Sequence, residues 1–185
     1  MKRARLENIA PVLLSADVAK TAEYYHGVLG FEVVEHYGAS EPFAALYRDG
    51  VEIIFVQAPF GQVEPNALRF GAGYDLYLDP EDVEGVDLLH AEFASRGACI
   101  LREPRLTPYG CYEFVVEDVD GRRVGVGRVK DRAVFFNRGP RSGSALREPP
   151  AGHSRPDAVT VLGQRSQAAG PACEPPARPF GDGGW

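Results

Sequence analysis

The sequence is poor in the residues that build disulfide scaffolds and metal centres. Three cysteines, Cys99, Cys111 and Cys173, are scattered over 185 residues, and no two of them have Cys-x-x-Cys spacing. Neither a disulfide framework nor a zinc site is therefore indicated. None of the four histidines has another His, Cys or Glu at metal-ligand spacing.

A long hydrophobic segment is also missing. The basic start of the chain, residues 1–5, is followed by Glu7 and Asn8 and not by an apolar stretch. The sequence therefore predicts no signal peptide, and no run of apolar residues is long enough to cross a bilayer. We expect a cytoplasmic protein that has no membrane partner.

Positive charge is scarce, and the composition changes near residue 132. Residues 1–132 hold 14 basic and 22 acidic residues, a balance that argues against a nucleic-acid partner and mildly favours cationic ligands. Residues 133–185 hold 8 Pro and 8 Gly, a level typical of disorder. We expect an N-terminal extension at residues 1–6, a folded domain at 7–131, and a disordered Pro/Gly-rich tail at 132–185.

The part of the sequence that is expected to fold contains the same order of strand and helix signals twice. An apolar strand at residues 9–14 leads to Asp17 and a helix at 18–29, and a second strand at 74–78 leads to Asp82 and a helix at 83–96. Each helix is followed by Gly and by three strand-like runs. The repeat predicts an α+β fold, with two βαβββ modules that form a curved sheet around a cavity. The remaining strands are expected at residues 31–37, 43–47, 51–57, 99–102, 111–117 and 123–129.

Alternation along the strands predicts which side chains face the helices. Leu76 and Leu78 suit the helix side, which leaves Asp75 and Tyr77 on the open side. In the last strand Val124 and Val126 suit the helices, which leaves two glycines on the open side.

Several short motifs resemble one known superfamily. They are Ser15-Ala16-Asp17-Val18, Tyr24-Tyr25 followed by Leu29-Gly30-Phe31, and Tyr109-Gly110-Cys111-Tyr112-Glu113-Phe114 followed by Asp118-Val119-Asp120-Gly121. In this order they resemble the glyoxalase / bleomycin-resistance / extradiol-dioxygenase superfamily, also called vicinal oxygen chelate. The resemblance covers about residues 7–130 and identifies the fold better than the reaction.

The resemblance implies four positions for metal ligands, and three of them lack a donor side chain. Enzymes of the superfamily hold a divalent metal with His, Gln or Glu on the open face. The matching positions here are Ala10, Ile54, Asp75 and Gly125. One carboxylate alone does not hold a catalytic ion against water. We therefore expect no metal, no cofactor and no catalytic residue, and the closest resemblance is to the metal-free bleomycin-resistance branch.

That branch implies a homodimer whose clefts bind small molecules. We expect a metal-free protein that sequesters a drug-like ligand at the dimer interface, as antibiotic-resistance proteins of this type do. The alternatives are a metal-dependent glyoxalase- or dioxygenase-like enzyme, acting as lyase or isomerase, and a ligand-binding module of a biosynthetic pathway. Asp75 is the expected anchor for a cationic group, so Asp75→Asn should weaken binding with little loss of stability. The expected aromatic walls are Tyr77, Phe55, Phe43, Tyr112 and Phe114.

Overall fold

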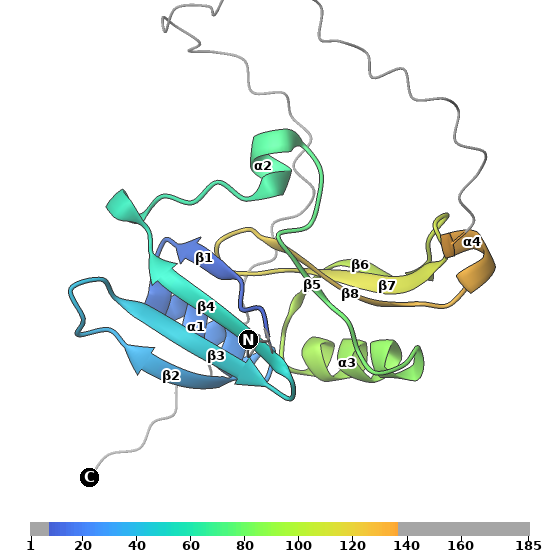
Figure 1. Ribbon diagram of the computed structural model, residues 1–185, viewed down its shortest axis with the longest axis horizontal. Coiled ribbons are helices and arrows are strands. Elements are labelled where there is room, and N and C mark those ends of the chain that lie inside the picture. The colour runs from blue at the N-terminus through green and yellow to red at the C-terminus, as the bar shows by residue number, and fades with distance from the viewer. Residues whose placement is uncertain (1–7, 137–185) are drawn as a thin grey trace, which may run out of the picture.

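The first module of the computed structural model, which describes residues 8–136, is a four-stranded sheet covered by one helix. In chain order its elements are β1 (Val12–Ser15), α1 (Val18–Gly27), β2 (Glu32–His36), β3 (Phe43–Arg48) and β4 (Val51–Gln57). The strand order is β1-β4-β3-β2, with β1 parallel to β4 and the other pairs antiparallel. We call this sheet A (Figure 1).

The second module repeats this arrangement after a linker. The linker holds a short 3-10 turn, η1 (Pro59–Gly61), and the short helix α2 (Asn66–Phe70). Sheet B then has the order β5-β8-β7-β6, with β5 parallel to β8. Its elements are β5 (Leu76–Leu78), α3 (Glu84–Ser95), β6 (Cys99–Leu106), β7 (Cys111–Glu117) and β8 (Arg123–Val129), and a last helix follows, α4 (Arg132–Phe136).

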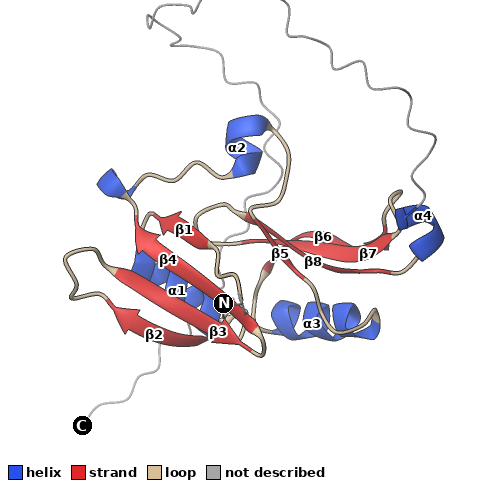
Figure 2. Ribbon diagram, viewed as in Figure 1, coloured by secondary structure: helices blue, strands red, loops and turns tan. Residues whose placement is uncertain are grey.

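The predicted α+β fold of two βαβββ modules is confirmed. Helices α1 and α3 each pack on one side of their own sheet (Figure 2), and one hydrophobic core contains residues of both modules. Leu76, Val124 and Val126 lie in this core, as their alternation predicts. The opposite, open face of each sheet is not covered by α1 or α3 (Figure 2). None of the helices in the described part of the chain is long and apolar enough to span a membrane.

Helix α1 begins at the predicted cap but ends at Gly27, two residues earlier than predicted. The carboxylate of Asp17 accepts hydrogen bonds from the backbone N–H groups of Ala19 and Lys20, both at 3.1 Å, and so caps α1. Helix α3 begins one residue later than predicted, and Asp82 reaches it through the backbone N–H of Gly85 at 2.8 Å.

The prediction for β6 was too short. This strand runs to Leu106, whereas the predicted strand ends at residue 102. The missed part contains Pro104, and proline is uncommon inside strands. Strand β6 is the edge of sheet B and its pairing with β7 contains register shifts on both sides of Arg102. An edge strand with bulges tolerates a proline because the missing N–H would have faced outward.

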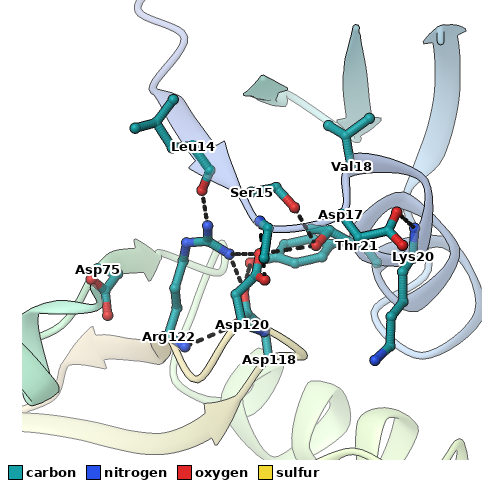
Figure 3. Close-up of polar contacts among 12 residues, drawn as sticks. Leu14, Ser15, Asp17, Val18, Lys20, Thr21, Asp75, Asp118, Asp120 and Arg122 are labelled. Carbon is teal, nitrogen blue, oxygen red and sulfur yellow. Dashed lines mark hydrogen bonds and ion pairs between the residues drawn. The ribbon is translucent and has the colours of Figure 1, made fainter. Parts of the chain in front are cut away.

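A buried polar cluster joins the two modules (Figure 3). Arg122, after the β7–β8 turn, pairs with Asp118 at 3.0 Å and Asp120 at 2.7 Å, and donates to the backbone carbonyl of Leu14 in β1. Asp120 in turn accepts from the hydroxyl of Thr21 in α1 at 3.1 Å. The turn of the second module is thus held against the strand and helix of the first.

The equivalent turn of the first module makes the reciprocal contact. Arg48, at the end of β3, pairs with Glu92 of α3 at 2.8 Å and donates to the carbonyl of Leu29. In each module, the arginine next to the turn between the last two strands therefore binds residues of the other module. These paired contacts fix the relative orientation of the two open faces.

Candidate functional site

The open face of sheet B is shaped by one aromatic ring that lies over two glycines. A Cβ atom at Gly125 would lie 2.7 Å from Cδ2 of Tyr77, and one at Gly127 would lie 2.3 Å from the Tyr77 hydroxyl oxygen. Neither distance is tolerable for a real Cβ atom, so any larger residue at these positions would displace the ring. The two glycines of β8 therefore make room for Tyr77.

Beside this ring lies a buried carboxylate with four donors. Glu113 in β7 is completely buried. Its Oε1 atom accepts from the hydroxyls of Tyr74 at 2.5 Å and Tyr109 at 2.6 Å and from Nη2 of Arg102 at 2.7 Å, and its Oε2 atom accepts from the Tyr77 hydroxyl at 2.9 Å. A buried charge requires such pairing, because desolvation without it is costly.

The same network keeps the phenols protonated. Burial, followed by the hydrogen bond to Glu113, raises the pKa of Tyr74, Tyr77 and Tyr109. All three hydroxyl hydrogens point at Glu113. The oxygen of Tyr74 in turn accepts from Nη2 of Arg102, so only the oxygens of Tyr77 and Tyr109 among the three keep lone pairs for other donors.

This cluster forms the wall of a cavity of about 390 Å³. The size is within the range of pockets that bind drug-sized molecules. Helix α4 contributes Phe135 to the wall. The helix sits against Gly110, whose carbonyl accepts from the backbone N–H groups of Lys130 and Asp131, both at 2.9 Å. The lining residues are Tyr74, Tyr77, Asp79, Tyr109, Cys111, Glu113, Gly127, Val129 and Phe135.

Of the five aromatic residues that were predicted to line a cavity, only Tyr77 lines this one. Phe55 and Phe114 are fully buried in the hydrophobic core, on the helix side of their strands, so placing them at a cavity was wrong. Tyr112 lies on the same side as Phe114, and its hydroxyl donates to Asp87 of α3 at 2.9 Å. Phe43 lies on the open face of sheet A, where its ring stacks on His36 at 4.3 Å between centroids.

The structure places Asp75 in a backbone-binding role. Its Oδ1 atom accepts from the backbone N–H of Asn66 at 2.9 Å, and its Oδ2 atom accepts from the backbone N–H of Arg123 at 3.0 Å. The carboxylate thus ties the start of α2 to the start of β8. It does not line the cavity around Glu113.

The residues present do not fit the metal that the fold family implies. Ala10, Ile54 and Gly125 offer no side-chain donor, and both oxygens of Asp75 are bound to the backbone. Within residues 8–136 no three His, Cys, Asp or Glu side chains gather in a way that could hold a metal ion. The ring of Tyr77 fills the space over Gly125 from which a ligand would project.

Sequence reasoning missed the centre of the cavity. Glu113 is a charged residue in the middle of an otherwise apolar strand, and this is the signal that could have found it. Tyr74 falls inside the strand predicted at residues 74–78, where alternation places it with Leu76 on the helix side, but β5 begins only at Leu76 and Tyr74 lies in the loop before it. Tyr109 lies in the loop before β7, where no alternation pattern assigns it a face. Arg102 lies between the two register shifts of β6, where counting alternate residues fails.

A second hollow lies at the junction of the modules. It has a volume of about 470 Å³ and is bordered mainly by linker and turn residues, with Ala16, Gln62 and Glu64 among them. Asp120, which also borders it, is already bound by Arg122 and Thr21. Its border contains no aromatic side chain.

Comparison with known proteins agrees with this architecture. The family description "Glyoxalase/Bleomycin resistance protein/Dioxygenase superfamily" matches residues 6–126. A comparison with curated protein sequences finds no match.

Solved structures with a similar fold share little sequence with this chain. A glyoxylase/bleomycin resistance protein/dioxygenase domain from Frankia sp. EAN1pec has a TM-score of 0.56 at 18% identity, over 69% of this chain and 96% of that one. A family protein from Nocardioides has a TM-score of 0.53 at 14% identity, over 71% and 88%. TnmS3, an antibiotic binding protein from Streptomyces sp. CB03234, has a TM-score of 0.50 at 19% identity, over 69% and 100%.

At these identities the structural neighbours establish the fold and leave the ligand open. The family match extends over about two thirds of the chain and includes every strand of both modules except the last residues of β8. The chain therefore belongs to the glyoxalase/bleomycin resistance protein/dioxygenase superfamily.

Proposed function

We propose that the protein binds a drug-like small molecule without a metal, in the cavity on the open face of sheet B, and so sequesters it as bleomycin-resistance proteins do. The observation that carries the proposal is the replacement of a metal site by an aromatic one. Tyr77 covers Gly125, and three phenols surround Glu113 where the cavity forms. TnmS3, an antibiotic binding protein, has a similar fold, which is consistent with a binding role.

The composition of the cavity wall also favours binding over catalysis. Glu113 is the one fully buried carboxylate there, and its two oxygens already accept four hydrogen bonds. A carboxylate bound in this way is a poor general base, because a proton taken from a substrate would have to displace one of these donors. The aromatic rings and Val129 offer apolar contact area to a ligand instead.

A second copy of the chain would complete the cleft. The open face of sheet A exposes apolar side chains in both of its edge strands, with Val12 of β1 61% and Val34 of β2 48% exposed. Such a face is unusual on a monomer and typical of an interface. In the proposed dimer, sheet A of one protomer covers the cavity of sheet B in the other, so each cleft is built from both chains.

The dimer is tested with two variants, one that places a charge on the open face of sheet A and one that places a charge on α3. Val12→Glu on the open face of sheet A should shift the protein from dimer to monomer in analytical ultracentrifugation. Leu88→Glu is the matched control, because Leu88 is 64% exposed on α3, away from that face. A wild-type protein that sediments as a monomer at all concentrations would contradict the dimer, as would a Val12→Glu variant that dimerises like the control.

The binding function is tested by thermal shift with a panel of drug-sized aromatic compounds, cationic, neutral and anionic. A compound present at about 100 times its Kd should stabilise the protein by about 2.7 kcal/mol. Val129→Trp fills the cavity and should abolish the shift, whereas Val51→Trp, at an exposed position in the first module, should not. A panel with no stabilising compound, an unaffected Val129→Trp variant, or near-stoichiometric Ni, Zn, Mn or Fe in the purified protein would overturn the proposal.

A further inference from the structure

The carboxylates around the open face of sheet B differ in how fully they are already bound. Asp75 uses both oxygens on backbone N–H groups. Glu113 accepts four hydrogen bonds and is charge-paired with Arg102 at 2.7 Å. Neither has an oxygen free to meet the charge of a ligand.

Asp79 is bound much less tightly. It follows Tyr77 by two residues, lies on the same side of the chain, and lines the cavity. Its Oδ2 atom pairs with Nη1 of Arg128 at 2.9 Å, and the two side chains are 60% and 41% exposed. Ion pairs between exposed side chains are weak and readily exchange partners. An entering cation can therefore take the place of Arg128.

The aromatic wall favours the same kind of ligand. The phenol hydrogens of Tyr77 and Tyr109 go to Glu113, so their hydroxyl oxygens face other groups as acceptors. The oxygen of Tyr74 already accepts from Arg102. The faces of these rings, together with Phe135 from α4, attract a cation through their π electrons. The charged residues among those that line the cavity, Asp79 and Glu113, are both acidic.

We propose that, within the binding function proposed above, the cavity selects a protonated amine attached to an aromatic body. The ammonium group lies between Asp79 and the phenol oxygens, where it finds both charge and acceptors. The aromatic body lies against Tyr77, Tyr109 and Phe135. An anionic ligand of the same shape meets the carboxylate of Asp79 and the acceptor oxygens of Tyr77 and Tyr109, and binds more weakly.

Helix α4 adds to the cavity a ring that lies outside the residues matched by the family description. The family match ends at residue 126, whereas α4 begins at Arg132 and brings Phe135 to the cavity wall. A cavity of the common fold alone would lack this ring. Phe135 is therefore a specificity-determining residue for the aromatic body of the ligand.

The probes for this proposal are three compounds with one body: 4-phenylbutylamine, 4-phenylbutanol and 4-phenylbutyrate. Isothermal titration of the full chain at low ionic strength should show the amine binding about tenfold more tightly than the alcohol, and the carboxylate more weakly than either. Asp79→Asn should remove the preference for the amine and leave the affinity for the alcohol unchanged. Asp75→Asn is the matched control and should retain the preference.

A variant with the opposite expected sign separates recognition from structure. Arg128→Gln removes the present partner of Asp79. It should strengthen amine binding several-fold, an effect that mere structural damage would not produce. Phe135→Ala should weaken the binding of amine and alcohol alike.

Each failure has a distinct meaning. If amine and alcohol bind equally to the wild type, the charge selection is wrong and the binding function stands. If the preference survives Asp79→Asn or is lost in Asp75→Asn, Asp79 is not the anchor. If none of the three compounds binds, while circular dichroism shows a folded protein, the binding function falls together with the selection.

Discussion

Asp75 offers the sharpest contrast between a structural and a ligand-binding carboxylate. Its two oxygens accept from the backbone N–H groups of Asn66 at 2.9 Å and Arg123 at 3.0 Å. Asp75→Asn keeps one acceptor oxygen and puts an NH₂ group where the other stood. One backbone N–H then loses its partner and faces another donor.

The magnitude follows from these contacts. A hydrogen bond to a charged acceptor contributes about 1.5–3 kcal/mol. Because the site is only partly buried, we expect Asp75→Asn to lower the free energy of unfolding by about 2 kcal/mol. The corresponding fall in Tm is roughly 6–10 °C for a domain of this size. Asp75→Ala removes both acceptors and should cost more, about 3 kcal/mol.

Urea denaturation of the wild type and the two variants measures this directly. The midpoint should fall in the order wild type, Asp75→Asn, Asp75→Ala, with similar m-values. Titration with 4-phenylbutylamine should give the wild-type Kd for Asp75→Asn. Unchanged stability together with a tenfold loss of amine affinity would refute this reasoning, and would restore the sequence-based expectation that Asp75 anchors a cation.

Three further outcomes follow from the packing, the buried ion pairs and the tyrosines. Gly127→Ala puts a methyl group 2.3 Å from the Tyr77 hydroxyl oxygen, so it should destabilise the fold by about 1–3 kcal/mol in urea denaturation and weaken 4-phenylbutylamine binding. Arg122→Met leaves the carboxylates of Asp118 and Asp120 unpaired and should cost about 3–5 kcal/mol, and a double variant with Asp118→Asn should cost less than the sum of the two single variants. In an alkaline titration the free energy of unfolding should begin to fall at about pH 9 and fall more steeply above about pH 10. Burial raises the pKa of the Cys111 thiol and of the phenols in the folded state, so the unfolded chain loses these protons at lower pH than the folded protein does. Tyrosinate absorbance should then show that Tyr24 and Tyr25 ionise only as the protein unfolds, because burial raises their pKa.

The fold could be predicted from the sequence because its signals are local and repeated. Asp17 caps its helix in the predicted place, and β4, β7 and β8 have the predicted bounds. Leu76 and Val124 alternate with residues that a core excludes, so their facing was also predictable. Residues 1–7 and 137–185, which include most of the predicted tail, lie outside the described residues. Helix α4 lies beyond residue 131, where the sequence predicts the domain to end.

The site was harder to predict because it depends on which face of a strand each side chain occupies and on residues in loops. Strand β4 is apolar on both sides, so nothing in the sequence shows that Phe55 faces the helices while Ile54 does not. Phe114 could have been placed correctly, because Glu113 and Glu117 share the opposite face of β7. The two backbone N–H groups that bind Asp75 come from a linker helix and from β8. Such contacts between distant segments cannot be read from local pattern.

The most direct test of metal-independent binding compares one affinity under two conditions. The Kd of 4-phenylbutylamine is measured by calorimetry on protein dialysed against a chelator, and again after an equimolar addition of Ni²⁺, Zn²⁺, Mn²⁺ or Fe²⁺. We expect the same Kd, because the amine meets Asp79 and the tyrosines and no described group of residues holds an ion. Binding that disappears on chelation and returns with one metal would contradict a metal-free site.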